Sequence, residues 1–424
     1  MIKNTNRKQV IHCNLSEICV SVLHNPGIYV LIHAPMSCSN IVYNSIINNI
    51  RRISLKFKRK IANPSEKIFV TNISDKEAIF GGENLLKRCL SQIIENKHPE
   101  CLIVVTGCTA SVIGDDVASI CLEAEMEYLL PVIYIPGAGF MSNQDQEGLL
   151  LSSKYIYQYV ADNTVPKNSS KAVLFGINKF LQTEEQKNEI LRLFRYFGIK
   201  NIVFAPCGMA MEEFENLNGV SLAIVHSLTY KKLMAYREFG KQFADYLNIP
   251  LVDEPLPFTV QATFKYLTYL GEITGQKEAA IRAIHQEKHY WEEERSTFNT
   301  KLSCRKYILA IGQPFRVNNP LDLLCLLEEV GMEIIQIVYL NSLTEKEILE
   351  FKELFSSHNI SISMIKENSG KISNDADVFI TSDYRKNFSR QVCIKRKRIG
   401  IGGCVHLLQC IVDLLEQGRW LKYE

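Results

Sequence analysis

The sequence predicts an α/β protein of three domains whose sheets are mainly parallel. Short runs rich in β-branched residues, apolar on both faces, alternate with amphipathic helical patterns, as expected for buried parallel strands in βαβ units. The 424 residues are too many for one ordinary domain. A composition of 46% hydrophobic and 22% charged residues is typical of a globular protein with sizeable cores.

The candidate strands fall into three series along the chain. They cover residues 28–32, 67–71, 102–106 and 132–135, then 172–175, 201–204, 223–226 and 250–252, and finally 307–311, 333–338, 361–364, 377–381 and 398–401. Two helix starts are marked by N-cap threonines. Thr183 precedes an apolar-periodic run to Phe197, and Thr344 precedes a similar run to Phe355.

Composition predicts the domain boundaries. Residues 162–170 are polar and contain a proline, which is typical of a linker. Residues 286–303 form a highly charged helical segment that we expect to connect two domains. We therefore divide the chain into three Rossmann-like α/β/α domains, because the later series resemble Rossmann-type halves. The N-terminal domain takes residues 1–165, the middle domain 166–303 and the C-terminal domain 304–424.

Net charge and hydropathy narrow the choice of partners and location. The net charge of +2 gives no strong field for nucleic acid or a membrane surface. The first ten residues are polar and basic without a following apolar segment, so we expect no signal peptide. No run approaches the ~20 apolar residues of a membrane helix. We expect a cytoplasmic protein that binds neither nucleic acid nor membrane.

Three of the thirteen cysteines lie where a loop could receive a ligand. Cys13 lies in an N-terminal loop, Cys38 follows a strand in YVLIHAPMSCSN, and Cys108 follows another in LIVVTGCTASVIGDDV. Ligands of α/β sheets collect outside the carboxyl ends of strands, and thiolates are the preferred ligands of iron–sulfur iron. Small neighbouring residues let the backbone approach a bulky cluster. From spacing alone, buried structural cysteines are the better interpretation, since no CxxC pair is present.

The full set of motifs resembles the nitrogenase component 1 family. This family includes the molybdenum–iron protein α and β subunits, their cofactor-assembly scaffolds and the protochlorophyllide reductases. It shows an early loop cysteine, a His-Gly-Pro-x-Gly-Cys motif, a Phe-Gly-Gly segment, and a strand ending Thr-x-Cys followed by Ile-Gly-Asp-Asp. The matching positions here are Cys13, residues 33–38 (HAPMSC), residues 79–85 (IFGGENL), residues 106–108 (TGC) and residues 113–116 (IGDD).

The resemblance implies a cofactor and partners. It implies an iron–sulfur cluster of [4Fe–4S] kind, bound by Cys13, Cys38 and Cys108 and shared with, or close to, a partner subunit. That partner is a second copy of this chain or a homologous component 1 subunit, in a dimer or an α2β2 assembly. A separate homodimeric iron protein is implied to dock over the cluster and to use ATP. No Walker A sequence is present here, so ATP belongs only to that iron protein.

Several positions depart from the family pattern and indicate a divergent member. Ala34 and Ser37 stand where the family has glycines. Ser227 stands where the nitrogenase α subunit anchors its metallocluster with a cysteine, and a hydroxyl is a poor iron ligand. His406 falls near the family's second ligand, but a histidine at a helix start is the simpler interpretation. Cys207 follows a strand and would line a substrate site, although a buried loop cysteine is simpler.

Two functions compete. The first is a reductase subunit that relays electrons from the ATP-dependent iron protein to a substrate in an interdomain cleft. The second is a non-enzymatic scaffold on which a nitrogenase-type metallocofactor is assembled; Ser227 favours the reductase slightly. The sequence assigns no catalytic residue. We expect His33 to support the Cys38 loop, and Asp115 and Asp116 to cap the following helix and bond loop backbone.

Overall fold

A computed structural model describes most of the chain, in two compact units. The described residues are 14–23, 25–57, 66–136, 148–176, 184–205, 208–226, 230–312, 319–358, 362–368, 370–382, 384–386, 388, 390–394, 398–416 and 421–423. Unit 1 comprises Met1–Gln182, Asn201–His226 and Lys231–Asp253. Unit 2 comprises Thr183–Lys200, Ser227–Tyr230 and Glu254–Glu424. The domain divisions near residues 165 and 303 stay predictions.

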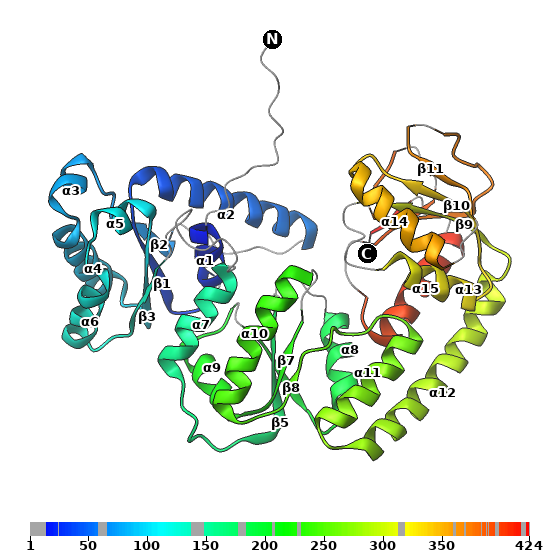
Figure 1. The fold of residues 1–424 in the computed structure, drawn as a ribbon, viewed down its shortest axis with the longest axis horizontal. Coiled ribbons are helices and arrows are strands. Elements are labelled where there is room, and N and C mark those ends of the chain that lie inside the picture. The colour runs from blue at the N-terminus through cyan, green and yellow to red at the C-terminus, as the bar shows by residue number, and fades with distance from the viewer. Residues whose placement is uncertain are drawn as a thin grey trace, which may run out of the picture. The chain divides into compact units, whose positions relative to one another are not determined.

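The first sheet of unit 1 is parallel and has the strand order β2-β1-β3-β4. Its strands are β1 (Ile28–His33), β2 (Ile68–Val70), β3 (Cys101–Thr106) and β4 (Val132–Ile135). The helices around it are α1 (Asn14–Leu23), α2 (Met36–Phe57), α3 (Asp75–Phe80), α4 (Glu83–Lys97), α5 (Cys108–Ile113), α6 (Val117–Tyr128) and α7 (Gly148–Val160) (Figure 1).

Alternating side chains of the central strands give this sheet a core on each face. Leu102 and Val104 of β3 pack in one apolar cluster with residues of α4 and α6. Ile103 and Val105 point the other way and pack with α1, α2 and α7. The sheet is therefore covered on both sides, as parallel sheets are.

The second sheet of unit 1 is also parallel and has the order β6-β5-β7-β8. It contains β5 (Asn168–Phe175), β6 (Asn201–Ala205), β7 (Val220–Val225) and β8 (Leu251–Val252), with α9 (Met211–Glu215), the 3-10 helix η2 (Asn216–Gly219) and α10 (Tyr230–Leu247). Phe175 makes edge contacts with Phe239 and Phe243, at centroid distances of 5.0 and 4.9 Å. These rings belong to the same apolar cluster as one face of the first sheet, so the two sheets share a core.

The sheet of unit 2 has the order β11-β10-β9-β12-β13-β14, parallel throughout its described residues. Its strands are β9 (Lys306–Ile311), β10 (Glu333–Tyr339), β11 (Met364–Lys366), β12 (Val378–Thr381), β13 (Gln391–Cys393) and β14 (Leu421–Tyr423). Its helices include α8 (Glu184–Arg195), α11 (Val260–Ile273), α12 (Lys277–Leu302), α13 (Pro320–Glu329), α14 (Glu345–Ser357) and α15 (Gly400–Glu416). This strand order is that of a doubly wound α/β sheet, whose topological switch point lies between β9 and β12. The predicted α/β class with mainly parallel sheets is confirmed.

Local sequence signals for helices are confirmed in two places. Thr344 is the predicted N-cap of α14, and the structure adds a capping box with Glu347. The charged connector is helical, but it begins earlier than predicted, at Lys277, and forms the 26-residue helix α12. The N-cap predicted at Thr183 lies outside the described residues, although α8 begins directly after it. No helix among the described residues is long and apolar enough to cross a membrane.

One predicted strand is wrong, and two strands were not predicted. Residues 398–401 do not form a strand, because α15 begins at Gly400. Ile401 belongs to a helical series, in which Ile401, Cys404, Leu408 and Ile411 are all buried. The strands β13 and β14 were missed because three residues are too few to show a periodic pattern. The strand predicted at 361–364 is β11, which begins only at Met364.

An ionic cluster ties α8, α12 and α15 together in unit 2. Arg192 donates to both oxygens of Glu189 at 2.7 and 2.8 Å and also pairs with Glu287, whose side chain is fully buried. Glu189 in turn accepts the backbone N–H of Gly402 at 2.9 Å. A Cβ at Gly402 would lie 2.5 Å from a Glu189 oxygen, so glycine is required where the carboxylate meets the helix start.

We expect Arg192→Ala to destabilise unit 2 more than loss of a surface ion pair does. It would leave the Glu189 and Glu287 carboxylates facing each other without their cation, at a cost of about 2–3 kcal/mol, since the guanidinium is itself one-third exposed. Urea unfolding measures the change. Lys301→Ala, which breaks the exposed Lys301–Glu416 pair in the same unit, is the control and should change the unfolding free energy little. Equal effects of the two variants would contradict this assignment.

Candidate functional site

The loops that carry Cys38 and Cys108 leave the same edge of the first sheet. β1 and β3 pair in parallel, with His33 opposite Thr106 at their carboxyl ends. Cys38 follows five residues after His33, in the first turn of α2, and its backbone N–H is bonded to the carbonyl of Pro35 at 3.0 Å. Cys108 is the first residue of α5. Both thiols are half-buried.

Direct packing joins these two loops. The Gly107 N–H donates to the carbonyl of His33 at 3.0 Å. A Cβ added at Gly107 would lie only 2.7 Å from the Cβ of Ala34, closer than real side chains approach. The small residues that the sequence places before each cysteine therefore allow the two loops to touch.

The three predicted ligands are not all within the described residues. Cys13 lies outside them, so its convergence with Cys38 and Cys108 stays a prediction. In the part of the chain that the structure describes, no group of three or more His, Cys, Asp and Glu side chains is arranged to hold a metal ion. The chemistry of the two described thiols, on touching loops at the ligand-binding edge, fits an iron–sulfur cluster whose other ligands come from elsewhere.

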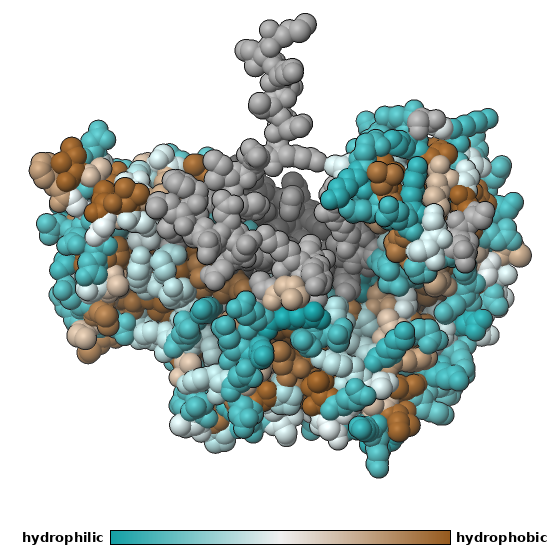
Figure 2. Space-filling model, in the orientation of Figure 1, coloured by the Kyte–Doolittle hydropathy of each residue, from teal (hydrophilic) through white to brown (hydrophobic). Residues whose placement is uncertain are grey.

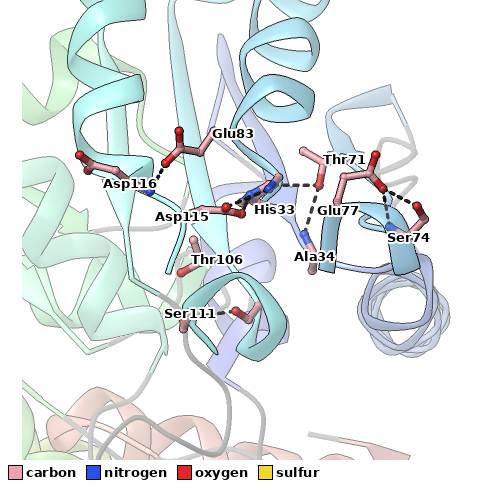
Figure 3. A network of polar contacts seen from close by, with 12 residues as sticks. His33, Ala34, Thr71, Ser74, Glu77, Glu83, Thr106, Ser111, Asp115 and Asp116 are labelled. Carbon is pink, nitrogen blue, oxygen red and sulfur yellow. Dashed lines mark hydrogen bonds and ion pairs between the residues drawn. The ribbon is translucent and has the colours of Figure 1, made fainter. Parts of the chain in front are cut away.

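A buried polar network lies directly behind the cysteine loops. Figure 3 shows His33 between Thr71 and Asp115. The His33 ring is fully buried and has Nδ1 3.0 Å from the Thr71 hydroxyl and Nε2 2.9 Å from Asp115 Oδ2. Thr71 Oγ1 also accepts the Ala34 N–H at 3.3 Å. Asp115 Oδ1 accepts the Gly82 N–H at 2.8 Å.

These partners fix the tautomer of His33. Asp115 is an acceptor, so the ring donates to it from Nε2. In the neutral ring Nδ1 then carries no proton and accepts, so the Thr71 hydroxyl donates to it while also accepting the Ala34 N–H. Burial lowers the pKa of His33 below its ordinary value, against the opposing effect of the hydrogen bond and charge of Asp115. His33 is therefore neutral at pH 7, and its contacts agree with the structural role predicted for it.

Asp115 and Asp116 accept hydrogen bonds from backbone N–H groups, which confirms the roles predicted for them. Asp116 is the N-cap of α6 and accepts the Ser119 N–H at 3.2 Å, while Asp115 bonds the loop at Gly82. Glu83 accepts the Asp116 N–H at 3.1 Å. Thr71 was missed by sequence reasoning. Its position at the end of a predicted strand, on the same edge as Cys38, is the signal that would have found it.

The other sequence candidates form no second site among the described residues. His406 lies on α15, 2.6 Å from Arg398 and 3.2 Å from Glu185, and it pairs with charged groups of unit 2. Cys207 and Ser227 lie outside the described residues, so their predicted roles stay untested.

We expect His33 to make folding less stable in acid. Because its pKa is lowered in the folded chain, the unfolded chain takes up the proton first as pH falls below the ordinary value of 6.5. Stability should therefore rise with pH across the window below 6.5, by at most about 1.4 kcal/mol per pH unit for one group. Urea unfolding of wild type and His33→Gln at pH 7 and about pH 5.5 measures this.

The His33→Gln variant should lose part of the difference between the two pH values. His98→Asn is the control, because His98 is exposed and already adopts a left-handed backbone that asparagine tolerates. It should keep the wild-type pH dependence. If His33→Gln keeps it as well, the buried neutral state of His33 is contradicted.

Comparison with known proteins adds structural and sequence relatives. The solved structure "Nitrogenase Cp1 at pH 6.5" matches with a TM-score of 0.54 and 13% identity, over 98% of this chain and 92% of that chain, a likeness of fold alone. The nitrogenase iron-molybdenum cofactor biosynthesis protein NifE of Clostridium pasteurianum is 26% identical over 318 residues, covering 73% of this chain and 64% of that protein. The nitrogenase molybdenum-iron protein alpha chain of Methanosarcina barkeri is 22% identical, covering 73% of this chain and 56% of its own length.

The matched part of this chain thus spans less than two thirds of the length of these two curated relatives. The match to a whole family covers more of the chain than either relative does. The family described as nitrogenase component 1 type oxidoreductase matches residues 20–407 of the 424. This chain belongs to the nitrogenase component 1 type oxidoreductase family.

Proposed function

We propose that this chain is a component 1-like subunit that holds an iron–sulfur cluster of [4Fe–4S] type and relays electrons from an ATP-dependent iron protein to a substrate. Cys13, Cys38 and Cys108 are its ligands, with a partner subunit beside or completing the site. The observation that carries the proposal is the contact between the Cys38 and Cys108 loops at one sheet edge. The cluster, when bound, supplies a site that accepts and gives up single electrons.

The surface around Cys38 suits a partner subunit. Met36, Ile41 and Tyr43 are exposed large apolar side chains in the first turns of α2, the helix that carries Cys38. Exposed apolar groups that cluster on a soluble protein mark interaction sites. We assign this surface to the second copy or homologous subunit, because burying it would also enclose the cluster and exclude water.

A second apolar surface suits the iron protein. Ile79 and Phe80 of α3 and Val112 of α5 are 74%, 80% and 69% exposed. α3 and α5 contact each other, and Figure 2 shows hydrophobic surface over both. Val112 lies one helical turn after Cys108 on the same helix, so a protein docked there would stand close to the thiolate. Short separation is what electron transfer between two proteins needs.

The sheet of unit 2 offers the place for a substrate. Its switch point lies between β9 and β12, where Gly312 and Ser382 follow the strands. The Ser382 hydroxyl is buried and has no hydrogen-bond partner among the described residues. A Cβ at Gly312 would lie 2.7 Å from Ser382 Oγ and 2.8 Å from Ser342 Oγ. A polar substrate group at this edge would satisfy Ser382, and the cleft between domains stays a prediction.

The second candidate is a scaffold for assembling a nitrogenase-type metallocofactor. It is favoured by the names of several relatives, which are cofactor biosynthesis proteins rather than reductases. Both functions use the same cysteines in unit 1, so the cluster site does not separate them. The two functions differ in the ligand bound by unit 2 and the partner subunit. A reductase binds an organic substrate there, whereas a scaffold binds a metallocluster.

We expect Cys38→Ala and Cys108→Ala each to lose most of the iron that the wild-type chain binds after anaerobic reconstitution. Each substitution removes a thiolate that no neighbouring described side chain replaces. Iron analysis and electron paramagnetic resonance (EPR) of the reduced protein measure the loss. Cys304→Ala is the control, because Cys304 is exposed and lies in unit 2. Wild-type levels of iron in both loop variants would refute the ligand assignment.

We also expect substrate reduction to require ATP. The reconstituted chain, with its partner subunit, is mixed with a nitrogenase-type iron protein, ATP and unsaturated test substrates under anaerobic conditions. Product that forms only with ATP and wild-type cysteines supports the reductase. Transfer of a bound metallocluster to a cofactor-free nitrogenase, without turnover of any substrate, would instead establish the scaffold.

A further inference from the structure

The outer face of α6 carries apolar side chains where a surface helix normally carries polar ones. Leu122, Met126 and Leu129 are 56%, 73% and 91% exposed, and their spacing places them in one row along the helix and its C-cap. We call this row the α6 ridge. The opposite face of α6, with Ile120 and Ala124, packs in the core of the first sheet. The α6 ridge adds nothing to that core, and exposed apolar groups gathered in this way mark an interaction site.

Leu129 also has an unfavourable backbone conformation. It is the C-cap residue of α6, with a φ of 53° in the left-handed region. Residues with a Cβ are strained there, and helices usually place glycine or asparagine at such a position. A leucine that is both strained and almost fully exposed stabilises neither the helix nor the core. Its presence is explained by a contact with another molecule.

The charges beside the α6 ridge are acidic. Glu123 and Glu127 line the side of α6 that faces α4, where Glu123 pairs with Lys87 at 2.6 Å. Glu125 faces α7 and accepts a hydrogen bond from the Tyr159 hydroxyl at 2.9 Å. The last turn of α6 has no basic residue, although the negative end of the helix dipole favours cations there. A partner that brings Lys or Arg side chains to this end would complement both the acids and the dipole.

A pocket of about 190 Å³ lies beside the ridge, between α4 and α6. Its apolar lining consists of the buried side chains of Leu90, Ile120 and Ala124, and charged residues of both helices complete it. Partners that bind as helices insert apolar side chains into such pockets at helical spacing. The pocket therefore offers a place for one apolar side chain of a bound helix.

We propose that the α6 ridge and this pocket form a docking site for a protein partner that presents an amphipathic helix, with an apolar stripe bordered by Lys or Arg side chains. A second copy of this chain fits less well, because α6 packed against α6 would bring the acids of the two helices together. The surface proposed for the iron protein lies on α3 and α5. The inference thus goes beyond the proposed function and needs no cluster on the cysteines.

A synthetic peptide tests the site. The probe is a fluorescein-labelled amphipathic helix made of leucine and lysine. One matched control peptide has glutamate in place of every lysine, and the other scrambles the same residues so that no apolar stripe remains. Fluorescence anisotropy with the full-length chain should show saturable binding of the leucine–lysine helix alone. Absence of that binding would overturn the proposal, and so would equal binding of the scrambled peptide, which would assign the signal to charge.

Substitutions on the ridge should weaken this binding. We expect Leu122→Ser and Met126→Ser each to lower the affinity by about tenfold, as for the loss of one well-buried apolar contact. Leu349→Ser is the matched control, because Leu349 is 58% exposed on α14 in unit 2, and it should bind as wild type does. Wild-type affinity in both ridge variants would place the peptide elsewhere and overturn the site.

Leu129→Gly separates a binding role from a structural one. Glycine adopts the left-handed conformation without strain, so the urea midpoint should rise while the peptide binds more weakly. A lower midpoint with unchanged peptide affinity would make Leu129 a structural residue and count against the proposal. Sedimentation of the wild-type chain tests the other occupant. A dimer that forms with rising concentration and that Met126→Ser abolishes would assign the ridge to a second copy and overturn the basic partner.

Discussion

The register between β1 and β3 places His33 opposite Thr106, and every feature of the candidate site depends on that pairing. The two strands are parallel and paired up to their last residues, His33 and Thr106. The loops that follow β1 and β3 therefore begin side by side at the same edge of the sheet. The loops then meet through Gly107 and Ala34, and the cysteines follow within a few residues of each strand end. A shift of one residue would reverse the faces of β3 and bury a different set of side chains.

The buried His33–Asp115 pair makes that edge costly to rearrange. A neutral imidazole and a carboxylate, both removed from water, need each other as partners, since an unsatisfied buried polar group costs about 1–3 kcal/mol. The same acid bonds the turn between α3 and α4. The edge that presents the cysteines is therefore built from charged and polar groups that each have a defined partner, whereas the sheet behind it is held by non-directional apolar packing.

Sequence reasoning reached the cysteine loops because strand ends and small residues are local signals. The strand before Cys108 is apolar throughout, and the glycine before the cysteine is visible in the sequence itself. Thr71 was not found, because its role comes from a contact with His33 across 38 positions of the chain. The start of α15 was mistaken for a strand for a related reason. Its glycines are explained by Glu189, which is 213 positions from Gly402 and whose carboxylate satisfies the helix start.

The departures from the family motif become intelligible at the contact between the loops. Ala34 stands where the family has glycine, and its methyl group occupies the space that a side chain at position 107 would need. One of the two positions can carry a methyl group provided that the other stays glycine, so Ala34 is accommodated without moving the strands. Ser37 is exposed and adds its hydroxyl on the outer side of α2. Neither substitution alters the strand pairing that sets the cysteines in place. The features that distinguish this chain from its relatives should therefore be sought away from the loops, at the edge of the sheet in unit 2.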